Sequence, residues 1–337
     1  MVLKAVNKIL AGGTLSLEEA ADTMNAIMSG EVGPVPIAAL LVALKQRGEK
    51  AEEVAGFVKS MRAHAVPVAI RDKDAVDGCG TGGDGAQTFN ISTAAALVAA
   101  AAGVTVAKHG NRSVSSQCGS ADVLEACGAQ IDPGPETVKD NINEVGFGFM
   151  FAPRFHPAMK HAVEPRRQLR MRTVFNILGP MSNPAGVTRQ LVGVYSREVM
   201  PLVAEVLAMS GSKHVLVVHS QDGLDEISIH APTDYIELKE GSRNEGSWDA
   251  ACLGLQGYGG EPLSGGDVKA NLKTMYDVLD GNAGQDADAV AVNAGAMIYV
   301  SGKVTSLAEG IVSARDVLKS GEGRAMLDQW ISATKAE

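Results

Sequence analysis

The sequence predicts an α/β protein with a small all-helical domain and a larger α/β domain, whose mainly parallel central sheet is flanked by helices. Residues 1 to about 65 contain helix-like segments and little strand signal. From about residue 69 onward, short β-rich segments alternate with helical ones, an order that favours a parallel sheet covered by helices. The length of 337 residues also favours two folding units, because single cores stop growing at roughly 250 to 300 residues.

The predicted helical domain comprises residues 1–68 and is joined by helices from about residues 130–190. Its first clear helix is TLSLEEAADTMNAIMSGE, in which apolar residues recur at three- and four-residue steps. Ser16 and Glu19 have the spacing of a capping box at its start. Two more helices are predicted in PIAALLVALKQRGE and AEEVAGFVKSMRAHA.

The predicted α/β domain, residues 69–337, contains four apolar segments that read as strands. They are residues 103–110, 146–152, 189–196 and 213–220. The helices predicted between and after them are STAAALVAAAA, SADVLEACG, ETVKDNINEVG, PAMKHAVEPRRQL, EVMPLVAEVLAMSG, DADAVAVNAGAMIYVSG and SLAEGIVSARDVLKSG. In such a sheet, the loops at the carboxyl ends of the strands carry the active site.

The composition argues against nucleic-acid and membrane partners. A formal net charge of -9 repels a polyanion, and 4% aromatic residues leave few rings for stacking on bases. No run of about 18 apolar residues occurs, and the N-terminus lacks the features of a signal peptide. Because the four cysteines form no CxxC pair, we expect reduced thiols and a cytoplasmic protein.

The glycine-rich stretch GCGTGGDGAQTFNIST, residues 78–93, predicts a phosphate-binding loop. Its glycines match GxGxxG, but Gly83 opens no helix and the next predicted strand ends in Lys108 where a dinucleotide site needs an acidic residue. A Walker loop would require a following Gly-Lys-Ser/Thr. The favoured interpretation is a wide glycine loop that runs into a helix N-terminus, where free N–H groups bind anions. A flexible linker is the alternative.

Polar residues in this stretch support that interpretation. Asn90, Ser92 and Thr93 supply cap residues and hydroxyl groups at the predicted helix start. Asp84 is a carboxylate in a predicted phosphate site. The Asp84 carboxylate is compatible with a phosphate site if it accepts hydrogen bonds that shape the loop, or if it lies near a metal that offsets its charge.

Three further polar clusters accompany the loop. In KHGNRSVSS, Lys108 and Arg112 supply cations for phosphate, while Asn111 and the serines supply donors. In HSQDGLDEIS, the adjacent carboxylates Asp225 and Glu226 suit Mg²⁺ together with phosphate oxygens. Each cluster taken alone is also compatible with a solvated surface loop. The third cluster offers four arginines of which one could bind a carboxylate: Arg166, Arg167, Arg170 and Arg172.

Motifs for covalent catalysis are absent. The sequence has no GxSxG, no HExxH and no evident Cys-His pairing. The chemistry is therefore expected to come from holding two substrates and stabilising charge.

Seven blocks, in order along the chain, resemble those of anthranilate phosphoribosyltransferases: GTGGDG, FNIST, KHGNRSVSS, GSADVLEACG, HPAMKH, RTVFNILGPMSNP and GLDE. The resemblance covers nearly the whole chain. It implies transfer of the phosphoribosyl group of phosphoribosyl pyrophosphate to the amine of anthranilate, a step of tryptophan biosynthesis. It also implies Mg²⁺, two ions per subunit, and a homodimer formed through the helical part.

The resemblance assigns roles to individual residues. Those with a catalytic role would be Lys108, His109 and Arg166. Anthranilate would contact Gly80, His109, Asn111 and Arg166, and Mg²⁺ would contact Ser92, Asp225 and Glu226. Phosphoribosyl pyrophosphate would be held by Gly80, Gly83, Asp84, Thr88, Asn90, Ile91, Ser92, Thr93, Lys108, His109, Gly110, Asn111, Arg112, Ser113, Val114, Ser115, Ser116 and Ser120.

The sequence departs from this family pattern near the implied outer anthranilate pocket. Glu164 and Pro165 stand where the family more often has Pro and an apolar residue, and Arg170 stands where it commonly has Gly. Two alternatives are a pyrimidine-nucleoside phosphorylase-like enzyme and a non-catalytic nucleic-acid-binding relative. The first is disfavoured because those chains are usually longer and carry a different Lys-Ser-Arg phosphate pattern. The net charge and the Asp225-Glu226 pair disfavour the second.

Overall fold

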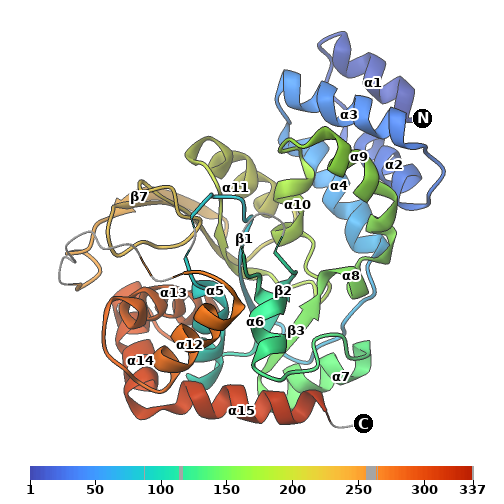
Figure 1. Ribbon diagram of the computed structural model, residues 1–337. Helices are drawn as coiled ribbons and strands as arrows, with labels where there is room; N and C mark the ends of the chain where they lie inside the picture. The colour runs from blue at the N-terminus through green and yellow to red at the C-terminus, as the bar shows by residue number, and fades with distance from the viewer. Residues whose placement is uncertain (87, 114–116, 256–262, 264, 336–337) are drawn as a thin grey trace.

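The computed structural model describes residues 1–86, 88–113, 117–255, 263 and 265–335. A helical unit lies at one end of the molecule, and a central sheet separates it from the C-terminal helices (Figure 1). Within the described ranges, no helix is both long and apolar enough to cross a membrane. The fold is a small helical N-terminal domain and a larger α/β domain, which confirms the predicted fold class.

Six helices of the helical unit share one hydrophobic cluster: α1 (Val2–Leu10), α2 (Leu17–Met28), α3 (Pro34–Arg47), α4 (Ala51–His64), α9 (Lys160–Leu169) and α10 (Phe175–Met181). The predicted capping box is present at the start of α2. The Ser16 side chain accepts from the Glu19 N–H at 3.2 Å, and the Glu19 carboxylate accepts from the Ser16 N–H at 2.8 Å. Figure 1 shows α9 and α10 beside the four N-terminal helices, although they follow β3 in the sequence.

In the described part of the chain, seven strands form one sheet in the order β3-β2-β1-β4-β5-β6-β7. They are β1 (Val76–Gly80), β2 (Val106–Gly110), β3 (Phe147–Phe151), β4 (Arg189–Gly193), β5 (His214–Ser220), β6 (Thr233–Lys239) and β7 (Ser242–Trp248). Strands β1 to β5 are parallel, and β6 and β7 add an antiparallel edge. Val76 of β1 pairs with Val106 on one side and Arg189 on the other, so β1 lies inside the sheet.

Helices cover both faces of the sheet. Outside the helical unit they are α5 (Ile91–Ala101), α6 (Ser120–Ala126), α7 (Pro135–Asp140), η1 (Asn141–Val145), α8 (Ala152–Phe155), η2 (Pro157–Met159), η3 (Arg197–Val199), α11 (Met200–Met209), α12 (Val268–Leu279), α13 (Gln285–Ser301), α14 (Leu307–Ser320) and α15 (Glu322–Thr334). Side chains alternate along a strand. Leu216 and Val218 therefore enter the core shared with α5 and α13, whereas Val215 and Val217 enter the core shared with α11 and the helical unit.

The four predicted strands are all present, each within its predicted segment. The interpretation of residues 78–93 as a loop is wrong at its start, because residues 78–80 belong to β1. Strands β6 and β7 were not predicted. The β7 sequence SRNEGSW forms an exposed edge strand without apolar alternation, so hydrophobic periodicity does not mark it. The domain boundaries at 1–68 and 69–337 stay predictions.

Candidate active site

The predicted site residues gather at the carboxyl ends of the parallel strands, where the strand order reverses. From β1 the chain builds β2 and β3 on one side and then crosses to β4 and β5 on the other. Loops diverge at such a point and leave a crevice in which ligands bind. The glycine loop follows β1, and Asp225 and Glu226 follow β5. The cluster KHGNRSVSS begins at Lys108 near the end of β2 and continues into the loop after it. Three of the four predicted clusters therefore reach this edge of the sheet.

The glycine loop is fixed through its backbone. The Thr81 N–H donates to the Gly193 carbonyl at 2.9 Å, at the end of β4. The Gly82 N–H donates to Asp225 Oδ2 at 2.7 Å. Gly82 and Gly83 have φ values of 64° and 76°, a region that glycine enters without steric cost. The loop therefore depends on glycine to turn from β1 toward Asp225.

Two strand-end glycines make room for Asp225. A Cβ on Gly80 would clash with the Asp225 carboxylate, and a Cβ on Gly193 would clash with the Asp225 carbonyl. The acidic loop thus packs directly on the ends of β1 and β4. Gly193 was not among the predicted site residues. Its signal in the sequence is a glycine inside the apolar run LVGVY, which is typical of a close backbone approach.

The N-terminus of α5 faces the same crevice. The Ser92 N–H, one of the free N–H groups of the first turn, partly offsets the rise that burial causes in the pKa of Glu226. Asn90 stands at the N-cap position, but its side chain does not cap the helix. It donates instead to the Cys118 carbonyl at 3.1 Å, so the predicted capping role of Asn90 is wrong. The remaining predicted residues here are half-buried or buried: Thr88, Ile91 and Thr93.

Asp225 and Glu226 lie together with a third carboxylate, Asp84. The charge of Asp84 acts on Asp225, and Asp84 Oδ1 accepts the Ala86 N–H at 3.2 Å. Burial and the Asp84 charge raise the pKa of Asp225, and burial and the Asp225 charge raise the pKa of Glu226. Asp84 therefore shapes the glycine loop and adds negative charge to the pair.

This set of carboxylates fits a divalent cation. Like charges in one buried crevice disfavour one another's ionisation, and a bound cation offsets them. In the part of the chain that the structure describes, no group of three or more His, Cys, Asp and Glu side chains is arranged to hold a metal by itself. Mg²⁺ ordinarily uses one or two carboxylates together with substrate phosphates. Asp225, Glu226 and the Ser92 hydroxyl would therefore hold the ion only with phosphate oxygens.

Lys108 supplies positive charge beneath this crevice. Its side chain is 2% exposed, and its Nζ donates to the Gly78 carbonyl at 2.6 Å and lies 3.5 Å from Ser92 Oγ. Burial raises the pKa of Asp77 and of Glu226, and the Lys108 charge partly offsets both shifts. A buried ammonium group needs such partners, because its desolvation is costly.

His109 is a buried neutral imidazole. Its Nδ1 lies 3.2 Å from the Gly179 carbonyl, and its ring lies 5.0 Å from the ring of His156. Burial, together with the neighbouring His156, lowers the pKa of His109 to about 3, and burial lowers that of His156 to about 4. Among the described residues, the Nε2 atom of His109 has no hydrogen-bond partner. His109 can therefore contribute to a substrate through a hydrogen bond but not through a charge.

The second polar cluster is anchored to α6. Arg112 forms ion pairs with Asp122 at 2.9 Å and with Glu125 at 2.8 Å. Asp122 also accepts the Ser113 N–H at 3.1 Å, so one carboxylate fixes both the backbone and the guanidinium of this loop. Ser120 Oγ donates to the carbonyl of Asn111 at 3.1 Å. Gly110 ends β2. Three residues of the predicted cluster lie outside the described residues: Val114, Ser115 and Ser116.

The predicted anthranilate arginine lies on the helical unit. Arg166 belongs to α9, with its guanidinium carbon 5.1 Å from the centre of the Phe175 ring, and burial lowers its pKa. A different member of the four arginines contacts the glycine loop. Arg172 donates to the Gly83 carbonyl and stacks on Tyr195, with 4.4 Å between its guanidinium carbon and the ring centre.

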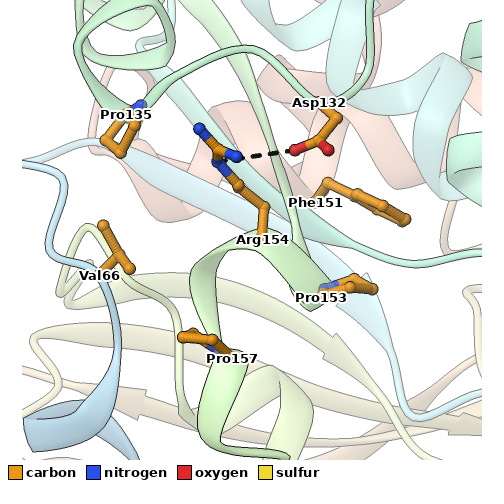
Figure 2. A pocket seen from close by; sticks show the side chains of 7 residues that line it. All are labelled: Val66, Asp132, Pro135, Phe151, Pro153, Arg154 and Pro157. Carbon is orange, nitrogen blue, oxygen red and sulfur yellow. Dashed lines mark ion pairs between the residues drawn. The ribbon is translucent and has the colours of Figure 1, made fainter. Parts of the chain in front are cut away.

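A pocket of about 530 Å³ lies beside the end of β3, where Phe151 pairs with Gly110. Its lining residues are Val66, Asp132, Pro135, Phe151, Pro153, Arg154 and Pro157. Figure 2 shows Arg154 and Asp132 paired within it, at 3.7 Å. None of the predicted site residues lines this pocket, so the candidate active site is the crevice at the strand ends.

Comparison with known proteins identifies the family. The model of the glycosyl transferase family helical bundle domain matches residues 3–65, and that of the family's a/b domain matches residues 72–324. A curated anthranilate phosphoribosyltransferase of Thermomicrobium roseum is 48% identical over 333 residues, which cover 98% of this chain and 96% of the relative. The chain belongs to the anthranilate phosphoribosyltransferase family.

Solved structures of anthranilate phosphoribosyltransferases share the whole fold. The enzyme of Thermus thermophilus has a TM-score of 0.94 at 44% identity, covering 98% of this chain and 99% of that one. The enzyme of Saccharomyces cerevisiae has been solved in complex with PRPP and Mg, and separately with 4-fluoroanthranilate. Each of those structures gives a TM-score of 0.88 at 27% identity, covering 99% of this chain and 97% of that one.

The departures from the anthranilate phosphoribosyltransferase pattern have visible local consequences. Arg170 ends α9 in the left-handed region, with φ of 49°, a conformation that glycine adopts more easily. Pro165 lies inside α9 and is buried, and Glu164 forms an ion pair with Arg167 at 2.6 Å. The helix that carries Arg166 is thus intact, and its end carries backbone strain.

Proposed function

We propose that this chain transfers the phosphoribosyl group of 5-phosphoribosyl 1-pyrophosphate to the amine of anthranilate. The products are N-(5'-phosphoribosyl)anthranilate and pyrophosphate, and the reaction is a step of L-tryptophan biosynthesis. The observation that carries the proposal is the packing of the Asp225 carboxylate against Gly80 and the Gly82 N–H. It joins a phosphate loop and an acidic pair in one crevice, in a chain of the anthranilate phosphoribosyltransferase family.

The donor would lie along the glycine loop and the start of α5. The backbone N–H groups of both elements suit the pyrophosphate, because they carry partial positive charge and permit close approach. Lys108 contributes its charge from beneath, through its position beside Ser92. The Asn111 to Ser113 segment, anchored by Asp122, would hold the ribose phosphate side of the donor.

Mg²⁺ would be held by Ser92, Asp225 and Glu226, at two ions per subunit. When bound there, it would neutralise the pyrophosphate charge that builds up as the bond to ribose breaks. The yeast relative's complex with PRPP and Mg supports this part of the proposal. The alternative of a non-catalytic relative gives no reason for the buried acidic pair on the phosphate loop.

The acceptor would be placed by residues from both domains. Arg166 on α9 is suited to the anthranilate carboxylate, since a guanidinium binds carboxylates in a bidentate manner. Gly80, Asn111 and the neutral His109 would contact the same substrate. The complex of the yeast relative with 4-fluoroanthranilate supports an aromatic acceptor in this family.

The reaction itself needs little covalent chemistry from the protein. The anthranilate nitrogen forms a bond to ribose C1 as the C1–O bond to pyrophosphate breaks, through an oxocarbenium-like transition state. The amine then loses a proton to water. An aromatic amine is neutral near pH 7, so a strong general base is not required, and His109 with a pKa of about 3 is a poor one.

The decisive experiment follows the loss of anthranilate fluorescence with enzyme, Mg²⁺ and phosphoribosyl pyrophosphate. We expect turnover by the wild type and a loss of about 10²-fold or more with Asp225→Asn and Glu226→Gln together. The matched control, Asp316→Asn with Glu322→Gln, changes the same charge on α14 and α15 and should keep full activity. An inactive wild type would overturn the proposed reaction, and full activity of the acidic-pair variant would overturn the metal assignment.

Arg166 gives a second test of the same proposal. Arg166→Ala should raise the KM for anthranilate much more than that for phosphoribosyl pyrophosphate, because only the acceptor carboxylate loses its partner. Equal effects on both constants would remove Arg166 from the acceptor site. We also propose a cytoplasmic enzyme that forms a homodimer through the helical unit.

A further inference from the structure

Asn293 is a polar residue in α13, a helix of the α/β domain whose side chains are mostly buried. It is fully buried, as are its neighbours Val292 and Ala294. An amide that is buried without hydrogen bonds destabilises the fold, because nothing compensates the desolvation of its polar atoms. An apolar residue of similar volume would fill this position without that cost. The amide of Asn293 therefore requires specific hydrogen-bond partners.

Those partners are almost entirely the backbone of one residue, Ile227. The Ile227 N–H donates to Asn293 Oδ1 at 3.0 Å, and Asn293 Nδ2 donates to the Ile227 carbonyl at 3.0 Å. The second Nδ2 hydrogen goes to the carbonyl of Ala289, one turn earlier on α13, at 2.9 Å. The amide thus pairs with both backbone groups of Ile227, in the way that a neighbouring strand would.

Ile227 directly follows Glu226, so the two hydrogen bonds between Asn293 and Ile227, here called the backbone clamp, fix the peptide next to the acidic pair. The other side of the acidic loop is fixed within the loop itself. The Asp222 carboxylate accepts the hydroxyl groups of both Ser220 and Ser228, which closes residues 220–228 into a compact turn. Asn293 ties the backbone of this turn to α13, a helix outside it.

The acidic loop has to stay against the phosphate loop if both are to contact one substrate. The Asp225 carboxylate accepts the Gly82 N–H at 2.7 Å, and the Asp225 carbonyl packs directly on Gly193. Outward movement of the loop would break these contacts and separate the pair from the phosphate loop. A bidentate backbone clamp on the adjacent residue resists that movement.

We propose that Asn293 is a positioning residue for magnesium binding: it holds the Asp225–Glu226 pair at the spacing required for a Mg²⁺–pyrophosphate substrate. The inference rests on the proposed function, and it adds a residue that contacts Ile227 from 66 positions away in sequence. Groups that orient metal ligands from outside the coordination shell typically change metal affinity by about 10- to 100-fold when mutated.

The test compares two buried asparagines. Asn293→Leu keeps the volume and removes both bonds to Ile227. Asn271→Leu is the matched control, because Asn271 is equally buried on α12 but donates to the carbonyls of Gly266 and Asp267. Asn293→Ser serves if the leucine variant does not fold. The hydroxyl of a serine in a helix donates to the carbonyl one turn earlier, here that of Ala289. The serine variant therefore loses the two hydrogen bonds to Ile227.

Three quantities are measured on the full-length enzyme: the Mg²⁺ concentration for half-maximal rate, calorimetric Mg²⁺ binding in the presence of phosphoribosyl pyrophosphate, and amide hydrogen exchange at Ile227. In Asn293→Leu and Asn293→Ser we expect a rise of about tenfold or more in the Mg²⁺ requirement, weaker Mg²⁺ binding and faster exchange. The KM for anthranilate should stay within about twofold of the wild type. Asn271→Leu should leave all of these unchanged.

Unchanged Mg²⁺ binding in both Asn293 variants, or an equal rise in Asn271→Leu, would overturn the inference. A different result would contradict the proposed function: the wild type itself would show no turnover or no dependence on Mg²⁺. A wild type that turns over with Mg²⁺ and Asn293 variants that match it would therefore overturn the positioning role alone.

Discussion

Gly80 is the residue at which the phosphate loop and the acidic pair meet. A side chain there would clash with the Asp225 carboxylate, so we expect Gly80→Ala to displace the acidic loop. The expected loss in kcat/KM for phosphoribosyl pyrophosphate is about 10²-fold or more, as for removal of a charge-stabilising contact. Steady-state kinetics over a range of Mg²⁺ concentrations measures it.

Gly134→Ala is the control for this change. Gly134 has φ of -62° and open space around its Cβ position, so alanine there should be neutral for activity. Wild-type kinetics in Gly80→Ala would show that Asp225 can move aside without consequence.

The buried histidines make the folding free energy depend on pH. The pKa of an unfolded histidine is about 6.5, whereas in the folded protein His109 and His156 have values of about 3 and about 4. Below about pH 6.5 the unfolded chain therefore binds protons that the folded protein does not. The contribution of the two histidines to the free energy of unfolding should fall as the pH drops toward 4, by up to about 1.4 kcal/mol per pH unit for each histidine. The raised pKa values of Asp225 and Glu226 contribute with the opposite sign.

Urea denaturation of the wild type and of His156→Asn at pH 7, 6 and 5 isolates the contribution of His156 as the difference between the two slopes. The variant lacks one of the two histidines, so about half of the histidine contribution should be missing from its slope. The same slope in the variant as in the wild type would show that His156 takes up a proton without unfolding.

At the scale of single elements, the end of α9 stores strain that one substitution should release. Arg170 has φ of 49°, and a side chain in this left-handed region costs roughly 1 to 2 kcal/mol. Glycine removes that cost but loses more entropy on folding, by about 0.5 to 1 kcal/mol. We expect Arg170→Gly to raise the free energy of unfolding by about 0.5 to 1 kcal/mol in urea denaturation.

Arg170→Ala separates the two effects. Alanine keeps the Cβ that causes the strain and removes only the guanidinium, so this variant should not gain stability. A gain of equal size in both variants would mean that the arginine side chain itself, and not its backbone conformation, destabilises the end of α9.

The elements that the sequence predicted are those with strong periodicity. The apolar segments that become β2 to β5 and the Ala-rich α5 are marked by their own residues. Strand β1 was not predicted, because its sequence VDGCG is short and contains two glycines. Its place in the sheet comes from pairing with β2 and β4. Such pairing joins distant segments, so local patterns do not reveal it.

The candidate site divides in the same way. Asp225 and Glu226 were predicted because adjacent carboxylates after a strand indicate a chemistry by themselves. The roles of Gly193 and Asn293 depend on contacts with residues 32 or more positions away in sequence, which no local pattern carries. Asn90 was misread for the same reason, since its long-range bond to Cys118 replaces the local cap.

At the scale of the whole molecule, the helical unit exposes an apolar surface on α1 and α3, which pack side by side (Figure 1). Leu3 and Leu10 on α1 are 60% and 68% exposed, and Val35 on α3 is 77% exposed. Several large apolar side chains on one pair of helices favour burial against another protein. A second copy of this chain is the occupant that the family resemblance implies, and a two-fold contact would use the same surface on both copies.

We therefore expect a dimer in sedimentation velocity and a monomer for Leu10→Glu combined with Val35→Glu, because each charge would have to be buried in the contact without a partner. Val312→Glu on α14 is the matched control: Val312 is 57% exposed but lies on the α/β domain, so this variant should remain dimeric. Since the crevice at the strand ends lies within one chain, the monomeric variant should keep its Mg²⁺ requirement. A wild type that sediments as a monomer, or a double variant that remains a dimer, would exclude α1 and α3 as the contact.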